Sequence, residues 1–157
     1  MDKANLQKWA LVAEIFGGIA VVVTLIFLVL ETRENTSALK AQTYHFLTAE
    51  LNDVRQDANE PDMSEMIWSL RQTGLEALDD VERWRVMNFV TGLFGVYESA
   101  YFALERGTLG AEEWARFHDR ICFNRQVYDE IWNPERGGSI VGSITPQFRD
   151  FIESECQ

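Results

Sequence analysis

The sequence is poor in the residues that build compact metal and thiol sites. Among 157 residues it contains two cysteines, Cys122 and Cys156, and two histidines, His45 and His118. Two cysteines exclude both a disulfide-dense scaffold and a zinc site with four cysteine ligands. Whether the two cysteines pair depends on the redox state of the compartment that they face, and the sequence leaves this open.

Basic residues are also scarce. The chain has 14 Lys and Arg against 25 Asp and Glu, which gives a formal net charge of −11 at pH 7. Nearly all of the acidic residues come after residue 30. Nucleic-acid affinity comes largely from clustered Lys and Arg that displace counterions from phosphates. The charge balance therefore argues against a nucleic-acid partner.

Motifs that name a chemistry are absent from the sequence. There is no P-loop, no Gly-x-Gly-x-x-Gly, no Gly-x-Ser-x-Gly and no His-Glu-x-x-His. No Glu is followed three residues later by a His, as a di-iron helical bundle would require. His118 and Cys122 lie four residues apart on a predicted helix, but they supply only two of the four ligands that zinc takes. We therefore predict a protein without enzyme activity or cofactor, with this pair as a weak metal candidate.

What the sequence does contain is one long apolar run. From Ala10 to Leu30 the only charged residue is Glu14. This run of about 21 residues, at about 1.5 Å each, matches a bilayer core of about 30 Å. The run lacks both a small-residue cleavage site at its end and the polar face of a soluble core helix. We therefore predict a short tail over residues 1–9, a transmembrane helix over 10–30 and an extramembrane helical bundle over 31–157.

The charges that flank this run do not predict its orientation. Lys3 and Lys8 precede the run, and Arg33 and Lys40 follow it. The positive-inside rule counts Lys and Arg close to a span and gives acidic residues little weight. The side of the membrane on which the bundle lies is therefore left open.

One face of the predicted span carries small residues. At about 100° per residue, Ala10, Glu14, Gly17, Gly18 and Val21 share one side of the helix. Small residues allow another backbone to approach closely, so we predict that this side is a helix-association face. Glu14 has two interpretations: it faces a partner helix or an aqueous channel, or it lies hydrated at headgroup depth near the helix start, where the helix dipole favours an acid.

The rest of the chain carries helix signals, so we expect an all-α fold. No Gly or Pro occurs after the span until Pro61, and the first helix is expected to continue to about Ala58. Further helices are predicted over residues 61–73, 79–106, 111–133 and 145–155, with a loop over 135–144. Their limits come from Pro, Asp and Thr at helix starts and from Gly at helix ends.

The third of these helices is unusually apolar between Val86 and Leu104. It reads either as a second membrane span or as the central helix of the bundle, and Glu98 in its C-terminal half favours the central helix. Tyr97, Glu98 and Tyr101 form an aromatic patch around one acid. Such patches belong to a core or line a pocket for a small ligand.

Three segments resemble a broad group of small bacterial membrane proteins. They are "VAEIFGGIAVVVTLIFLVLETRENTSALKAQTY", "YESAYFALERGTLGAEEWARF" and "PQFRDFIE". Members of that uncharacterised group carry Ala-Glu-Ile near the start of a span and Arg-x-Asn-Thr just after it. The resemblance implies a single-pass protein of the bacterial inner membrane, and it implies no activity because the group has none assigned.

Together these features predict a non-enzymatic, membrane-anchored helical protein. It would act as an assembly or accessory subunit of a membrane complex or of a homo-oligomer. Its expected partners are membrane lipid, and either itself or other membrane-protein subunits. The alternative is a membrane-anchored sensor that binds a small ligand at Tyr97, Glu98 and Tyr101.

Overall fold

The computed structural model describes residues 3–132 and 140–156. These residues form α-helices and short 3-10 turns, and none of them lies in a β-strand. The predicted all-α fold is therefore confirmed. The chain divides into two units, residues 1–39 and 40–157, and each is described by itself.

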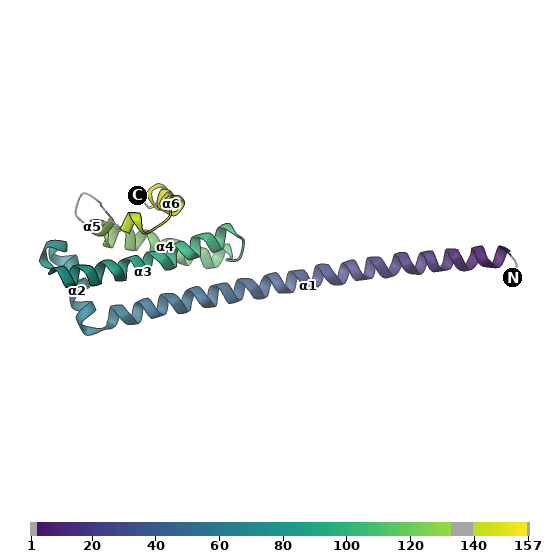
Figure 1. The fold of residues 1–157 in the computed structure, drawn as a ribbon, viewed down its shortest axis with the longest axis horizontal. Helices are drawn as coiled ribbons and strands as arrows, with labels where there is room; N and C mark the ends of the chain where they lie inside the picture. The colour runs from purple at the N-terminus through teal and green to yellow at the C-terminus, as the bar shows by residue number, and fades with distance from the viewer. Residues whose placement is uncertain (1–2, 133–139, 157) are drawn as a thin grey trace. The chain divides into compact units, whose positions relative to one another are not determined.

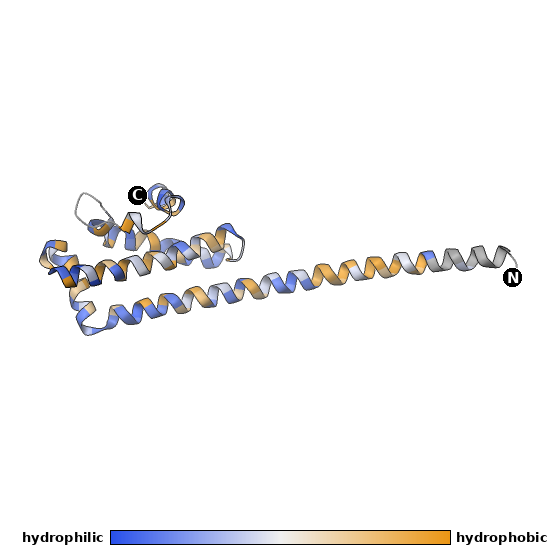
Figure 2. Cartoon of the chain, in the orientation of Figure 1, coloured by the Kyte–Doolittle hydropathy of each residue, from blue (hydrophilic) through white to orange (hydrophobic). Residues whose placement is uncertain are grey.

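The first helix is continuous, as the lack of Gly and Pro near its middle suggests. α1 spans Lys3–Asn59 and ends directly before Glu60 and Pro61 (Figure 1). Between Ile15 and Leu30 its large apolar side chains are 50 to 68% exposed, and Figure 2 shows this part of α1 as an apolar segment. Among the described residues, α1 is the one helix long and apolar enough to cross a membrane, and none of its apolar window is buried in protein.

The second unit is a helical bundle built around one central helix. Its elements after α1 are α2 (Pro61–Thr73), η1 (Leu75–Ala77), α3 (Asp80–Glu105), α4 (Ala111–Val127), α5 (Asp129–Trp132), η3 (Ile140–Gly142) and α6 (Pro146–Glu155). α3 contacts α2, α4 and η3, and in Figure 1 α4, α5 and α6 lie together on one side of it. Its buried side chains are Val86, Val90, Leu93, Phe94, Val96, Tyr97, Ala100, Tyr101 and Ala103. The prediction of a central helix, and not of a second span, is confirmed.

Short-range signals in the sequence set most helix limits. The Asp79 carboxylate accepts hydrogen bonds from the Val81 and Glu82 amides, and the Glu82 side chain accepts one from the Asp79 amide. These reciprocal bonds form the capping box that the sequence predicts. Gly74 and Gly107, which follow α2 and α3, have φ of 87° and 70°, where glycine is favoured.

The predicted helix over residues 111–133 is not continuous: it is interrupted at Tyr128 and forms two helices, α4 and α5. α4 ends at Val127, and Tyr128 has φ −108° and ψ 30° before the single turn of α5. Contacts far along the chain explain the break: Ile131 and Trp132 are buried, and the Glu130 carboxylate accepts a hydrogen bond from the Leu75 amide at 2.8 Å. η3 lies within the predicted loop, and the remaining predicted residues 133 and 135–139 are outside the described residues.

Candidate functional site

The predicted helix-association face is exposed in the described part of α1. Glu14 is exposed, and Val21 is 59% exposed. A Cβ atom added to Gly17 or to Gly18 would meet nothing within 4 Å. The side chain of Ala10 lies outside the described part. The small-residue face is therefore exposed at each of its positions that the structure describes.

Hydroxyl groups along the apolar segment are satisfied within the helix. Thr24 is the only polar residue between Ile15 and Leu30, and its hydroxyl donates to the Ala20 carbonyl at 2.9 Å. Two residues beyond the segment, the Thr32 hydroxyl donates to the Leu28 carbonyl at 2.7 Å. A buried hydroxyl without a partner costs free energy in hydrocarbon, so these bonds make the segment suited to a bilayer.

Tyr97, the first of the predicted pocket residues, belongs to the core. Its side chain is 1% exposed and packs edge-on against Phe94, with 5.7 Å between ring centroids. Its hydroxyl oxygen accepts a hydrogen bond from Asn124 Nδ2 at 2.8 Å. Burial raises the pKa of Tyr97 to about 12, against the smaller lowering by the nearby Arg120 and Arg55.

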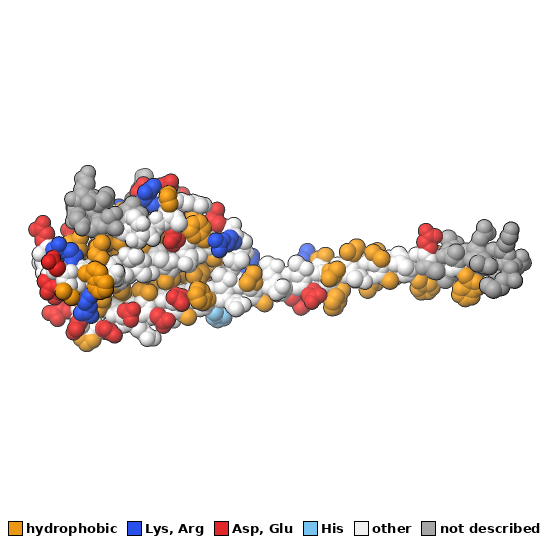
Figure 3. Space-filling model, in the orientation of Figure 1, with side chains coloured by type: hydrophobic (Ala, Val, Ile, Leu, Met, Phe, Trp, Pro, Cys, Tyr) orange, Lys and Arg blue, Asp and Glu red, His pale blue; other side chains and the backbone are white. Residues whose placement is uncertain are grey.

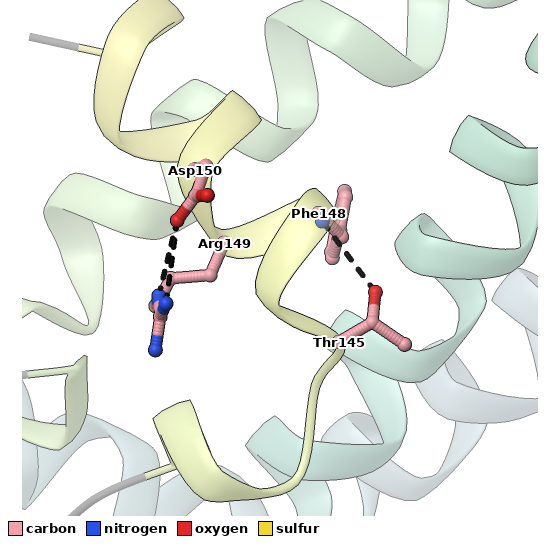
Figure 4. Close-up of polar contacts among 4 residues, drawn as sticks. All are labelled: Thr145, Phe148, Arg149 and Asp150. Carbon is pink, nitrogen blue, oxygen red and sulfur yellow. Dashed lines mark hydrogen bonds and ion pairs between the residues drawn. The ribbon is translucent and has the colours of Figure 1, made fainter.

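Glu98 holds the start of the last helix. Its Oε1 accepts a hydrogen bond from the backbone N–H of Thr145 at 2.6 Å. Thr145 is the N-cap of α6, and its own hydroxyl accepts from the Phe148 amide (Figure 4). In the next turn, Arg149 pairs with Asp150 at the surface. Glu98 therefore positions a capping residue that is far from it in sequence.

Tyr101 also contacts α6. Its ring packs against Phe151 and Phe148, with centroid distances of 4.9 Å and 5.5 Å. Its hydroxyl oxygen accepts a hydrogen bond from Gln147 Nε2 at 3.3 Å. The three residues of the predicted pocket thus bind parts of their own chain, two of them at α6, and a ligand at this position stays a prediction.

The weak metal candidate, His118 with Cys122, loses one of its two possible ligands to a disulfide bond. Cys122 is bonded to Cys156, with 2.03 Å between the sulfur atoms, and a bonded sulfur is not a thiolate ligand. His118, one turn earlier on α4, packs against the rings of Trp114 and Phe151. Within residues 3–132 and 140–156, no group of three or more His, Cys, Asp or Glu is gathered so as to hold a metal ion. The pairing that the sequence left open is thus present in the structure.

Sequence reasoning missed an acidic groove at one end of the bundle. The groove has a volume of about 300 Å³ and lies between α2, η1 and the start of α3. Its lining is Asp62, Glu65, Met66, Ser69, Ala77, Leu78, Glu82 and Arg85, with Arg85 4.0 Å from Asp62. Figure 3 shows acidic side chains over much of the visible face of the bundle. The acids at the starts of α2 and α3 were visible in the sequence, but only the packing of these helices brings them together.

Comparisons with known proteins add no relative. No known protein-family model matches the chain, and no curated protein or solved structure is significantly similar to it. The function is therefore inferred from the residues and their geometry.

Proposed function

We propose that this chain is a single-pass protein of the bacterial inner membrane and a non-enzymatic subunit of a membrane assembly. The apolar segment of α1 anchors it in the bilayer. The face with Glu14, Gly17 and Gly18 binds a second transmembrane helix, which comes from another copy of the chain or from a different subunit. The resemblance of the residues around the span to a group of small bacterial membrane proteins supports the bacterial location.

One observation carries the proposal: the glycine face is open. Apart from the neighbouring backbone of α1 itself, no atom of the described residues lies within 4 Å of a Cβ placed on Gly17 or Gly18. Apolar burial does not drive helix association within lipid, because lipid tails are as apolar as leucine. Association depends instead on close backbone approach, which two adjacent glycines permit. An acid on the same face adds a group that gains from a polar partner.

The bundle supports the role of an assembly subunit by folding around its own core. Among the residues whose side chains the structure describes, 26 buried hydrophobic residues from Leu47 to Ile152 make up this core, and none of these comes from the apolar segment. The surface carries most of the excess negative charge of the chain. The sensor alternative stays a prediction; in the folded bundle Tyr97, Glu98 and Tyr101 are hydrogen-bonded to Asn124 of α4 and to Thr145 and Gln147 at the start of α6.

The experiment is a change of the glycine face with a matched change on the opposite face. In the test variant, Gly17→Leu and Gly18→Leu are combined, which places branched side chains where the partner backbone would lie. In the control variant, Ile19→Leu and Val23→Leu are combined, because at about 100° per residue these positions lie roughly opposite Glu14. The full chain is extracted in a mild detergent, and its assembly mass and co-purifying proteins are measured.

We expect the glycine variant to lose its partner and the control to keep the assembly of the parent. An unchanged mass together with an unchanged set of co-purifying proteins in the glycine variant would sink the proposal. A third variant, Glu14→Leu, separates the two interpretations of this acid. Assembly changes if Glu14 faces the partner helix, and it stays the same if the carboxylate is hydrated at headgroup depth.

A further inference from the structure

The two cysteines of the chain form a bond that fastens its last helix. Cys122 lies on α4 and Cys156 is the C-cap of α6, 34 residues later. The sequence contains no other cysteine, so every thiol of the chain is used in this bond. In the cell, the two cysteines are therefore either bonded to each other or present as two free thiols. A thiol-reactive reagent distinguishes these two states.

The bond completes a set of contacts along α6. At its start, Thr145 is held by the Glu98 carboxylate at 2.6 Å. In its middle, Phe148 and Ile152 are fully buried in the core. At its end, Cys156 is bonded to α4. α6 packs against α4, and this packing holds Cys122 and Cys156 where their sulfur atoms are bonded.

The compartment follows from the chemistry of this bond. Structural disulfides persist in oxidising compartments, whereas the reducing systems of the cytosol keep most thiols free. A membrane-spanning α1 places the residues before and after it in different compartments. Lys3, Lys8, Arg33 and Lys40 leave the orientation undecided, so the disulfide is the feature that decides it.

We propose that the bundle lies on the oxidising, non-cytosolic side of the membrane and that Cys122 and Cys156 are a site of enzymatic thiol oxidation there. The start of α1 then lies in the cytosol. This inference rests on the membrane anchor of the proposed function. The negative charge of the bundle does not oppose the orientation, because acidic residues contribute little to topology and long domains cross largely regardless of charge.

The oxidant is a protein disulfide of higher reduction potential. One of the two cysteine thiolates attacks a sulfur of that disulfide, which forms a mixed disulfide and releases the other oxidant sulfur as a thiolate. The second cysteine thiolate then attacks the sulfur of the first, closes the bond between Cys122 and Cys156, and releases the second oxidant sulfur. Two thiols lose two protons and two electrons, and the oxidant leaves as a dithiol.

The first test reads the thiols of the unaltered full chain. Bacterial cells that produce it are quenched in acid, and the membrane fraction is treated with a maleimide that adds mass, with and without prior reduction. We expect two adducts after reduction and none before it. Cys122→Ser and Cys156→Ser variants serve as controls, since each leaves one free thiol that reacts without reduction. Two adducts without reduction of the parent would overturn the proposal.

The second test reads the orientation. In a chain with Cys122→Ser and Cys156→Ser, a single cysteine is introduced by Ser64→Cys, at an exposed site of α2, or by Lys3→Cys, before the span. A membrane-impermeant maleimide is applied to intact cells and to permeabilised cells. We expect Ser64→Cys to be labelled in intact cells and Lys3→Cys only after permeabilisation. Labelling depends on the side of the membrane, so the result holds even if the loss of the disulfide loosens the bundle.

The reverse labelling pattern would overturn the orientation. Alkaline extraction of the same membranes separates this failure from a failure of the anchor. A chain that leaves the membrane under alkali defeats both proposals. A chain that stays in the membrane but carries free thiols defeats only the inference about the oxidising side.

Discussion

The Glu98 carboxylate on α3 accepts a hydrogen bond from the Thr145 backbone at 2.6 Å, across 47 residues of chain. Thr145 in turn caps α6 through its hydroxyl. Because Glu98 binds the backbone of the N-cap residue, it fixes the position of the first turn of α6 on the bundle. The Thr145 hydroxyl caps that same turn. One acid in the C-terminal half of the central helix therefore helps to fix the start of α6 on the bundle.

We first predict that Glu98→Ala lowers the free energy of unfolding by about 1 kcal/mol, because the Thr145 amide loses its acceptor. Glu98→Gln keeps an acceptor oxygen and is expected to cost less. Glu105→Ala, which changes an exposed acid on the same helix, serves as the control. The measurement is denaturant unfolding of the full chain in mild detergent, with hydrogen exchange of the α6 amides. Equal protection of α6 in the parent and in Glu98→Ala would contradict the role of this acid.

We next predict that the combined Cys122→Ser and Cys156→Ser variant unfolds more easily than the parent. The bond closes a loop with a sequence separation of 34, and its loss is expected to cost about 3 to 4 kcal/mol through the larger entropy of the unfolded chain. The parent measured in the presence of a reductant provides the comparison, since it should match the variant. Coincident unfolding curves for the oxidised parent and the variant would refute this prediction.

A third prediction compares the same substitution at two exposures. Phe148 on α6 is fully buried and Phe123 on α4 is 59% exposed. Phe148→Ala opens a cavity in the core and is expected to cost about 3 to 5 kcal/mol, whereas Phe123→Ala is expected to stay within about 0.5 kcal/mol of the parent. Tryptophan fluorescence in a guanidinium titration reports both. If the two variants unfold at the same denaturant concentration, the docking of α6 is not as described.

The fourth prediction concerns alkaline pH. Burial raises the pKa of Tyr97 from 10.0 to about 12, so the unfolded chain releases this proton at a lower pH than the folded chain. Unfolding therefore releases a proton between pH 10 and 12. The contribution of Tyr97 is fully present below pH 10, and roughly 2 to 3 kcal/mol of stability is lost as the pH rises through this window.

Tyr97→Phe removes the ionising group and should flatten this part of the pH profile. The substitution removes the acceptor for Asn124 Nδ2, which keeps its other bond, to the Arg120 carbonyl at 2.9 Å. The free energy of unfolding is measured for both chains from pH 7 to 12. Below pH 10 the two profiles should run parallel. Parallel profiles above pH 10 as well would show that Tyr97 does not titrate as described.

The parts of the fold that depend on neighbours in sequence were predictable. Asp79 with Glu82, Thr145 with Pro146, and the two glycines after α2 and α3 each act within one helical turn, so the sequence marks them directly. The apolar run of α1 is also a local signal, because it is recognised by its own length, which matches the thickness of the hydrocarbon core of a bilayer. The face with Gly17 and Gly18 follows from the same helical geometry.

The parts that the sequence missed or left open depend on residues far apart in the chain. The break at Tyr128 contains no Gly or Pro, and it accompanies the burial of Ile131 and Trp132. The bond between Cys122 and Cys156 needs α6 to lie beside α4, which no spacing reveals. The acidic groove likewise forms only where α2 meets the start of α3.

The exposure of the apolar segment of α1 has a consequence for how such a chain can change over evolutionary time. With the proposed membrane anchor, these side chains would contact lipid and partner helices, whereas the side chains of the core contact one another. Substitutions at positions 14 to 21 therefore leave the packing of the core of the bundle unchanged. If α1 is the proposed anchor, substitutions in one or two of its turns would change the membrane assembly that the chain joins and would leave the bundle as it is.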